Sequence, residues 1–462
     1  MSFSRKFPVI APLALISLIS SMPKAMAVPS FAVQTGQSCV ACHQGGEFPV
    51  LTSYGRTFKI NGYVDSDGES KAPPISFFIQ PSFTSTAKGQ LGGAAPHFSN
   101  NDNAALSQAS ILYAGRLFGP YATSLFGAEA AKTLDKFGVF AQATYDGVGD
   151  VFSWDNAEIR YADSATIFGQ ETDYGFYLNN NPTMQDPWNS TPVWGFPYSS
   201  SGLAASPAAA TLIDGGFGQQ VLGIGAYALI SKSFYVDFAL YRTAGLKFQQ
   251  NMGVDTADEA EISGVAPYWR LAYTKNFGDQ SFEAGIFGMA ANTYPARDSS
   301  AGRDSTVDWG IDSQYQAVIG KNYFTGTASL IYEDQNRDAS KTLGSTTNRS
   351  DYLMTGKVAL DYIYDKTVGG TVGYFLADGS RDAGLYPDSR KGSPLSDGLI
   401  LQANYLPFGK GGGPSFWPNS SLKLSAQYVI YNRFDGSSSN YDSSGRNARD
   451  NNTLYLEAWA AF

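Results

Sequence analysis

The feature that most restricts the fold of this chain is an alternation of apolar and polar residues with a period of two. It runs from about residue 75 to the C-terminus, in segments of about ten to fourteen residues. The clearest segment places one apolar face on Leu422, Leu424, Ala426, Tyr428 and Ile430. The residues between them are mostly polar, and aromatic residues gather near the segment ends. This pattern is typical of strands that cross an outer membrane as a closed β-barrel.

The connections between these segments alternate in length. Short turns are expected at 231–233, 320–322 and 365–366, and long polar loops at roughly 244–265, 292–304, 335–351, 377–397 and 433–450. Outer-membrane barrels have short periplasmic turns and long outside loops, whereas a soluble β-sandwich has no reason to sort its turns. We therefore predict an all-β fold, a transmembrane antiparallel barrel of about 16 strands over residues 75–462. Its lumen is expected to be wide enough for an aqueous channel.

Residues 1–27 have the pattern of a secretory signal sequence. Arg5 and Lys6 supply a charged start, an apolar segment follows, and Ala25-Met26-Ala27 is a small-x-small cleavage site. Cleavage after Ala27 removes three positive charges and no acid, which changes the formal charge from −9 to −12. A chain this acidic is not a nucleic-acid binder by electrostatics, and we expect the mature protein outside the cytoplasm.

The only two cysteines lie in the sequence Cys39-Val40-Ala41-Cys42-His43. This is the attachment pattern of a c-type haem: each thiol forms a thioether with a haem vinyl group, and His43 is the proximal iron ligand. The alternatives are a thiol redox pair, a structural zinc site and a disulfide. The first usually opens a helix in a βαβ unit, the second needs four ligands, and the third has no use for His43. We predict one covalent haem c.

The sequence constrains the sixth haem ligand less. His97 is the only other histidine, and it is our first choice as the distal iron ligand; its alternative role is that of a surface-loop histidine. The methionines of the mature chain are expected in a lipid-facing strand, in another strand and in long loops. They are Met354, Met289, Met184 and Met252. A His/His pair favours a lower reduction potential than a His/Met pair.

Residues 28–74 contain the haem motif and precede the first predicted strand. They are too short to bury a strong core by themselves, so we predict that they form a monohaem cytochrome c plug inside the barrel lumen. Arg56 and Lys59 follow the motif closely and are candidates for contacts with the haem propionates. The alternative is contact with acidic groups of the pore wall, and the sequence favours neither.

Several short motifs surround the cysteines, and other motifs lie further along the chain. Those near the cysteines are Pro29 to Gly36, Cys39 to His43, Phe48-Pro49, Leu51-Thr52, Tyr54 to Arg56, Phe58-Lys59 and Gly62-Tyr63. Those further on are Asn101 to Leu106, Asn179 to Thr183 and Trp188 to Pro197. In these motifs the chain resembles the fused outer-membrane cytochrome–porins of iron-oxidising bacteria, over essentially its whole mature length. It departs from that pattern at Val33, Gln37 and residues 45–47, beside the haem motif.

The resemblance implies an outer-membrane protein that takes electrons from extracellular Fe(II) and passes them to a periplasmic cytochrome or other electron carrier. If the chain is an enzyme, the resemblance implies an electron-transfer oxidoreductase. The barrel is expected to be surrounded by outer-membrane lipid. Two alternatives stay open. One is a haem conduit for another extracellular donor, such as a solid surface or a sulfur compound. The other is a solute porin with an accessory haem segment.

Overall fold

The computed structural model describes residues 30–462, apart from residue 258 and residues 416–419. The predicted signal sequence, residues 1–27, lies outside the described residues. Strand β1 (Ile75–Thr86) starts where the period-two alternation starts. We call residues 30–74, which precede it, the N-terminal segment. Its helices are α2 (Ser30–Thr35), α3 (Cys39–Cys42), η1 (Gln44–Gly46) and α4 (Ser53–Ile60).

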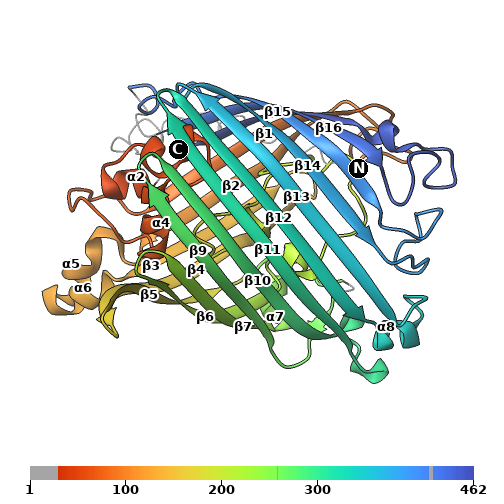
Figure 1. Cartoon of the computed structure of the whole chain (residues 1–462), viewed down its shortest axis with the longest axis horizontal. Coiled ribbons are helices and arrows are strands. Elements are labelled where there is room, and N and C mark those ends of the chain that lie inside the picture. The colour runs from red at the N-terminus through yellow and green to blue at the C-terminus, as the bar shows by residue number, and fades with distance from the viewer. Residues whose placement is uncertain (1–29, 258, 416–419) are drawn as a thin grey trace, which may run out of the picture.

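Seventeen strands of the described chain form one antiparallel sheet that closes on itself (Figure 1). β1 pairs with β2 (Asn103–Arg116) on one side and with β17 (Thr453–Ala461) on the other. β8 (Glu261–Ile262) has two residues, so sixteen longer strands form the wall and the predicted strand number is confirmed. The others are β3 (Phe137–Asp146), β4 (Val151–Ile167), β5 (Gln170–Asn179), β6 (Val221–Ile230), β7 (Phe234–Thr243), β9 (Ala266–Phe277), β10 (Gln280–Tyr294), β11 (Asp304–Ile319), β12 (Asn322–Asn336), β13 (Ser350–Tyr364), β14 (Val368–Gly379), β15 (Ser396–Tyr405) and β16 (Ser421–Arg433).

Side chains along the strands alternate between the outer and inner faces of the barrel, because successive residues of a strand point to opposite sides. In β7, Phe234, Val236 and Phe238 are 57%, 37% and 53% exposed, whereas Tyr235 and Asp237 are buried. An apolar outer face suits contact with lipid tails. The closed ladder also leaves no strand edge with unpaired backbone groups in the bilayer.

The two ends of the barrel differ in the length of their connections. At the end where β1 starts, the predicted turns near residues 231, 320 and 365 are confirmed, and we call it the short-turn end. We call the opposite end the long-loop end, because the predicted long loops lie there. The strands reach further into these loops than expected: β10 continues to Tyr294 and β11 starts at Asp304.

Three connections depart from the predicted sorting. Residues 117–136 form a long connection at the short-turn end, residues 406–420 join β15 to β16 as a second long connection at that end, and residues 147–150 form a tight turn at the long-loop end. The first contains η2 (Gly119–Tyr121), α5 (Ala122–Phe126) and α6 (Ala128–Leu134), and Figure 1 shows α5 and α6 projecting away from the barrel. The long-loop connections contain α7 (Leu246–Asn251), η5 (Pro295–Arg297), η6 (Ser299–Ala301), α8 (Asp338–Leu343) and η7 (Ala448–Asn451). Among the described helices, none is long and apolar enough to cross a membrane.

The N-terminal segment lies against inward-facing wall residues close to the short-turn end. The contacts join Ser30 Oγ to the carbonyl oxygen of Ala114 (2.5 Å), Asn404 Nδ2 to Glu47 Oε1 (2.7 Å) and Arg56 Nη1 to Gln316 Oε1 (2.6 Å). The wall residues in these pairs are among the last few residues of β2, β15 and β11 before the short turns. The segment is therefore held at this mouth of the barrel, where Figure 1 also shows α2 and α4.

The long connection between β5 and β6, residues 180–220, folds into the lumen, and we call it the inner segment. It contains η3 (Pro192–Trp194) and η4 (Leu212–Gly216). Its hydrogen bonds to other parts of the wall include those that join Ser190 to Asp312 of β11, Tyr198 to Asp361 of β13 and Ser199 to Glu457 of β17. The inner segment therefore crosses the lumen, a feature that the sequence did not predict.

Arg270 of β9 ties the inner segment to the wall. Its guanidinium is fully buried and bonds Asp312 at 2.8 and 2.9 Å and Glu283 at 2.9 Å. Its Nε lies 3.5 Å from Asp186 of the inner segment. The Asp186 carboxylate also accepts backbone N–H groups of the inner segment, from Trp188, Ser190 and Thr191. One buried cation thus compensates carboxylates from two strands and from the inner segment.

Arg270→Met is expected to destabilise the barrel by about 3–5 kcal/mol, because it leaves buried carboxylates without a counter-charge. The measurement is the free energy of unfolding in urea. Arg349→Met is the matched control: Arg349 pairs with Asp338 at 2.7 Å, but their side chains are 73% and 52% exposed. An exposed pair contributes at most about 1 kcal/mol. Equal losses in the two variants would contradict the anchoring role of Arg270.

Candidate cofactor site

The helical turn α3 brings the two cysteines to one side. Cys39 and Cys42 are three residues apart and therefore neighbours on a helix surface, and the backbone N–H of His43 donates to the carbonyl of Cys39 at 2.9 Å. Both cysteines are free thiols and partly exposed. At His43 the backbone leaves the helix for an extended conformation and forms a β-bridge with Leu51. The imidazole therefore lies beside the two thiols, at the start of a short extended segment.

All three side chains line one internal cavity of about 640 Å³. The cavity lies between the N-terminal segment, the inner segment and the barrel wall. Its apolar lining includes Phe31, Phe48, Leu51, Phe58, Leu112, Phe140 and Trp194. It extends to Ser107 and Tyr455, which lie in the long-loop halves of β2 and β17. Its size is within the range of roughly 300–1,000 Å³ for cofactor sites, and its apolar lining suits a flat apolar cofactor.

Burial decides the protonation of the three motif side chains. It raises the pKa of Cys39, and burial, the Cys39 thiol and Asp65 raise the pKa of Cys42 to about 12. A catalytic thiol pair needs a lowered pKa, so these thiols are poorly suited to redox exchange. Burial also lowers the pKa of His43 to about 4, with the backbone of Val50 acting in the opposite direction. The imidazole is therefore neutral at pH 7, the form that ligates a metal.

Arg56 and Lys59 project from α4 into polar surroundings of the lumen. Arg56 donates to the carbonyl oxygen of Leu51 (3.0 Å) and to Gln316 (2.6 Å). Lys59 lines the cavity, and its Nζ donates to the carbonyl oxygen of Met184 (2.8 Å) and to Asn189 Oδ1 (2.9 Å). Within the described residues neither side chain forms an ion pair with an acidic wall residue. Lys59 alone is at the cavity surface, so it remains the better candidate for a propionate contact.

His97 lies far from the cysteine motif along the barrel. It is exposed, has a φ of 70° and belongs to the connection 87–102 at the long-loop end of β1. The motif lies near the short-turn end, so the structure does not bring His97 to the cavity. Among the described cavity-lining residues, His43 is the only histidine and none is a methionine. The Met184 and Met289 side chains are buried elsewhere.

Glu47 and Lys423 are two buried charged residues beside the motif that sequence reasoning missed, and they do not form an ion pair with each other. Glu47 is 1% exposed and its Oε1 accepts a hydrogen bond from Asn404 at 2.7 Å. Burial raises the pKa of Glu47 to about 7, Asp361 acts in the same direction and Lys423 in the opposite one. The only sign of these residues in the sequence was Lys423 itself, a lysine on the polar face of the clearest alternating segment. Nothing there indicated that Glu47 would lie near it.

Glu47→Gln is expected to change how stability depends on pH. The pKa of Glu47 is raised from 4.5 to about 7 on folding, so its stabilising protonated form is fully present below about pH 4.5 and lost as pH rises through 7. The wild type should therefore lose roughly 3 kcal/mol relative to Glu47→Gln between pH 4 and pH 8. Urea unfolding at several pH values measures this difference. A difference between wild type and Glu47→Gln that stays flat with pH would contradict it.

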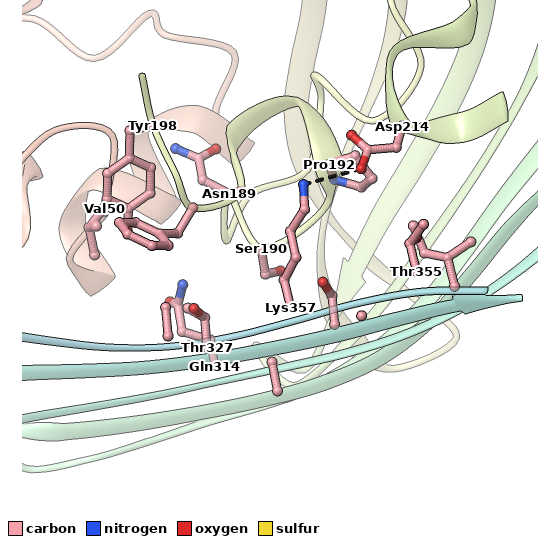
Figure 2. Close-up of a pocket in the computed structure, with 17 residues that line it drawn as sticks. Val50, Asn189, Ser190, Pro192, Tyr198, Asp214, Gln314, Thr327, Thr355 and Lys357 are labelled. Atoms are coloured by element: carbon pink, nitrogen blue, oxygen red, sulfur yellow. Dashed lines mark hydrogen bonds and ion pairs between the residues drawn. The ribbon is translucent and has the colours of Figure 1, made fainter. Parts of the chain in front are cut away.

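A second, much smaller cavity separates the inner segment from strands β11 to β13 (Figure 2). It measures about 30 Å³, enough for one or two water molecules. Lys357 reaches from β13 to Asp214 of the inner segment, with Nζ and Oδ2 3.1 Å apart, as the dashed line in Figure 2 marks. Asn189, Asp214 and Lys357 line both cavities. The inner segment thus leaves only a water-sized gap along this part of the wall.

No protein-family model and no curated protein matches this chain. Solved structures of similar form include the anion-selective porin from Comamonas acidovorans, with 12% identity over 84% of this chain and 98% of that one and a TM-score of 0.45. The outer membrane channel DcaP of Acinetobacter baumannii has 11% identity over 84% and 96%, with a TM-score of 0.44. OmpT of Vibrio cholerae has 10% identity over 85% and 99%, with a TM-score of 0.42.

Proposed function

We propose that this chain is an outer-membrane monohaem c-type cytochrome–porin that takes electrons from extracellular Fe(II) and passes them to a periplasmic electron carrier. The observation that carries the proposal is the position of Cys39, Cys42 and His43 on the wall of one apolar cavity inside a barrel with a lipid-facing outer surface. In this reading residues 28–74 are the haem plug, the short-turn end faces the periplasm and the long-loop end faces outward.

The residues around the cavity fit a covalently bound haem. Two free thiols three residues apart are available for two thioethers, and a neutral imidazole lies beside them. The Nδ1 atom of His43 is buried without a hydrogen-bond partner among the described residues. The lining offers aromatic and aliphatic side chains to a porphyrin, and Lys59 offers the one cation of α4 at the cavity surface. A haem bound here supplies a one-electron couple.

The chain would contribute attachment, ligation and an apolar contact surface to the group. Cys39 and Cys42 would hold the group against loss to the surroundings, His43 would present its imidazole to the iron, and the aromatic and aliphatic part of the lining would pack against the porphyrin. Each Fe(II) gives up one electron outside and becomes Fe(III), and the periplasmic carrier gains that electron. The hydrocarbon layer is about 30 Å thick. A cavity that extends from the motif to the long-loop halves of β2 and β17 shortens the distance to an outside donor.

The inner segment favours electron transfer over solute passage. A 16-stranded barrel otherwise leaves an aqueous channel. Here one mouth holds the N-terminal segment, and residues 180–220 reach β11, β13 and β17 across the lumen. The gap beside β11 to β13 holds only about one or two water molecules. A lumen that is obstructed at one mouth and crossed by the inner segment suits a protein that passes electrons and retains solutes.

The test is anaerobic addition of Fe(II) to the oxidised, purified mature protein in detergent, followed by the reduced α-band. We expect the band to rise, and to be absent from a Cys39→Ala/Cys42→Ala variant carried through the same preparation. The alternative outcome is reduction by a sulfur compound or an electrode but not by Fe(II), at a pH where Fe(II) is a strong enough donor. That result would show that the extracellular donor is not Fe(II). A colourless wild type would overturn the haem and leave a porin.

A further inference from the structure

Lys423 of β16 is a buried ammonium with one long hydrogen bond among the described residues. Its side chain points into the lumen and is 1% exposed. The only hydrogen bond of Nζ among the described residues goes to the carbonyl oxygen of Phe48, and it is long, at 3.4 Å. No described carboxylate lies within ion-pair distance of it. Burying a charge without a close counter-charge is costly. The burial of Lys423 therefore needs a compensating interaction or a functional role.

Other buried cations of the described chain are compensated. Arg160 has Glu158 at 2.7 Å, and Arg270 has Asp312 at 2.8 Å. Lys59 donates two hydrogen bonds shorter than 3 Å to amide-type oxygens. Lys357, at the surface of the same large cavity, pairs with Asp214 at 3.1 Å. Lys423 has no carboxylate at such a distance among the described residues, and the nearby acids Glu47 and Asp361 act on its charge only at longer range.

Three aromatic rings surround the ammonium instead. Its Nζ lies 4.9 Å from the ring centre of Trp459, 5.4 Å from that of Phe48 and 5.6 Å from that of Tyr198. These rings come from the last strand, the N-terminal segment and the inner segment, so the cage forms only when all three meet. Cation–π contact stabilises a desolvated ammonium. The cage thus holds a positive charge in place while keeping water away from it.

The cage adjoins the proposed iron ligand. Phe48 packs edge-on against the imidazole of His43 with ring centres 6.0 Å apart, and Lys423 Nζ lies 5.4 Å from the centre of the same phenyl ring. Phe48, Tyr198 and Trp459 all line the large cavity together with Cys39, Cys42 and His43. One layer of aromatic side chains therefore separates the charge from the cavity. The electrostatic field of Lys423 thus reaches the cavity through protein, which screens a charge less than water does.

We propose that Lys423 is a positioning residue that raises the reduction potential of the cofactor bound at Cys39, Cys42 and His43, which rests on the proposed function above. A fixed positive charge disfavours the more positive, oxidised iron relative to the reduced iron. At about 10 Å and an effective dielectric constant of about 20, Coulomb's law gives a change of about tenfold in the ratio of reduced to oxidised iron. The charge makes the haem a better acceptor for a donor that releases its electron reluctantly.

The test is a spectroscopic redox titration of the full-length haem-loaded protein carrying Lys423→Met, which keeps most of the side-chain volume and removes the charge. At the ambient potential where the wild type is half reduced, the variant is expected to be about tenfold more oxidised. Lys423→Arg should restore the wild-type ratio. Lys357→Met is the matched control, since Asp214 cancels much of that charge, and its ratio should change much less.

The outcomes separate this inference from the proposed function. If the wild type carries haem and is reduced by Fe(II) but Lys423→Met titrates like the wild type, the role of Lys423 is wrong and the proposed function stands. If the wild type carries no haem, the proposed function fails first. If Lys423→Met does not assemble, Lys423→Gln, which keeps a donor for the Phe48 carbonyl, repeats the titration. If neither Lys423→Met nor Lys423→Gln assembles but Lys423→Arg does, the positive charge is needed for folding, and the inference is overturned.

Discussion

Replacing both Cys39 and Cys42 by alanine is expected to leave no haem on the denatured chain. The wild type should keep its haem through denaturation, because thioether bonds survive loss of the fold, whereas a haem held only by His43 and the apolar lining is released on unfolding. Haem staining of a denaturing gel gives an all-or-none result. The pyridine haemochrome spectrum should also move in each single variant, because one vinyl group is then left unreacted.

Ser38→Ala is the control for this prediction. Ser38 directly precedes α3, is exposed, and its side chain makes no cap hydrogen bond to the helix. It should carry as much covalent haem as the wild type. Haem retained by the double cysteine variant, or wild-type protein that is colourless when made with the haem-attachment apparatus, would contradict the assignment of the motif.

The second large effect is expected in electrical conductance. The wild-type barrel in a planar bilayer should stay near the baseline, because the N-terminal segment holds one mouth and the inner segment crosses the lumen. Deletion of residues 30–74 should open the short-turn mouth and give a measurable but narrow channel. Replacement of residues 192–211 by a short Gly-Ser linker in addition should give a channel of porin size, as expected for a lumen of sixteen strands.

Shortening the connection 117–136 is the matched control for these deletions. It lies at the same end as the N-terminal segment, but α5 and α6 project away from the barrel (Figure 1), so the channel should stay closed. Porin-like conductance of the wild type would show that the lumen passes solutes. That result would favour the solute porin with an accessory haem segment over the closed electron conduit.

The features that could be predicted from the sequence are those determined by residues close to one another along the chain. The alternation of Phe234, Val236 and Phe238 with Tyr235 and Asp237 determined which side of β7 faces outward, because a strand repeats every two residues. The number of long strands and the position of most turns followed from the same period. The side-by-side arrangement of Cys39, Cys42 and His43 also needs only one helical turn and the residue after it.

Only the tertiary structure decided what fills the lumen. Arg56 meets Gln316 across 260 positions of the chain, and Lys59 meets Asn189 across 130, so no local pattern indicates that these cations have neutral partners. The same holds for the cage of Lys423. His97 was the only other histidine, yet β1 separates it from the motif by the length of a strand. The inner segment has no period of its own, and its path is set by scattered polar contacts with strands that come later in the chain. Periodic structure is encoded by residues a few positions apart, whereas the contents of a barrel depend on side chains that meet only after the sheet has closed.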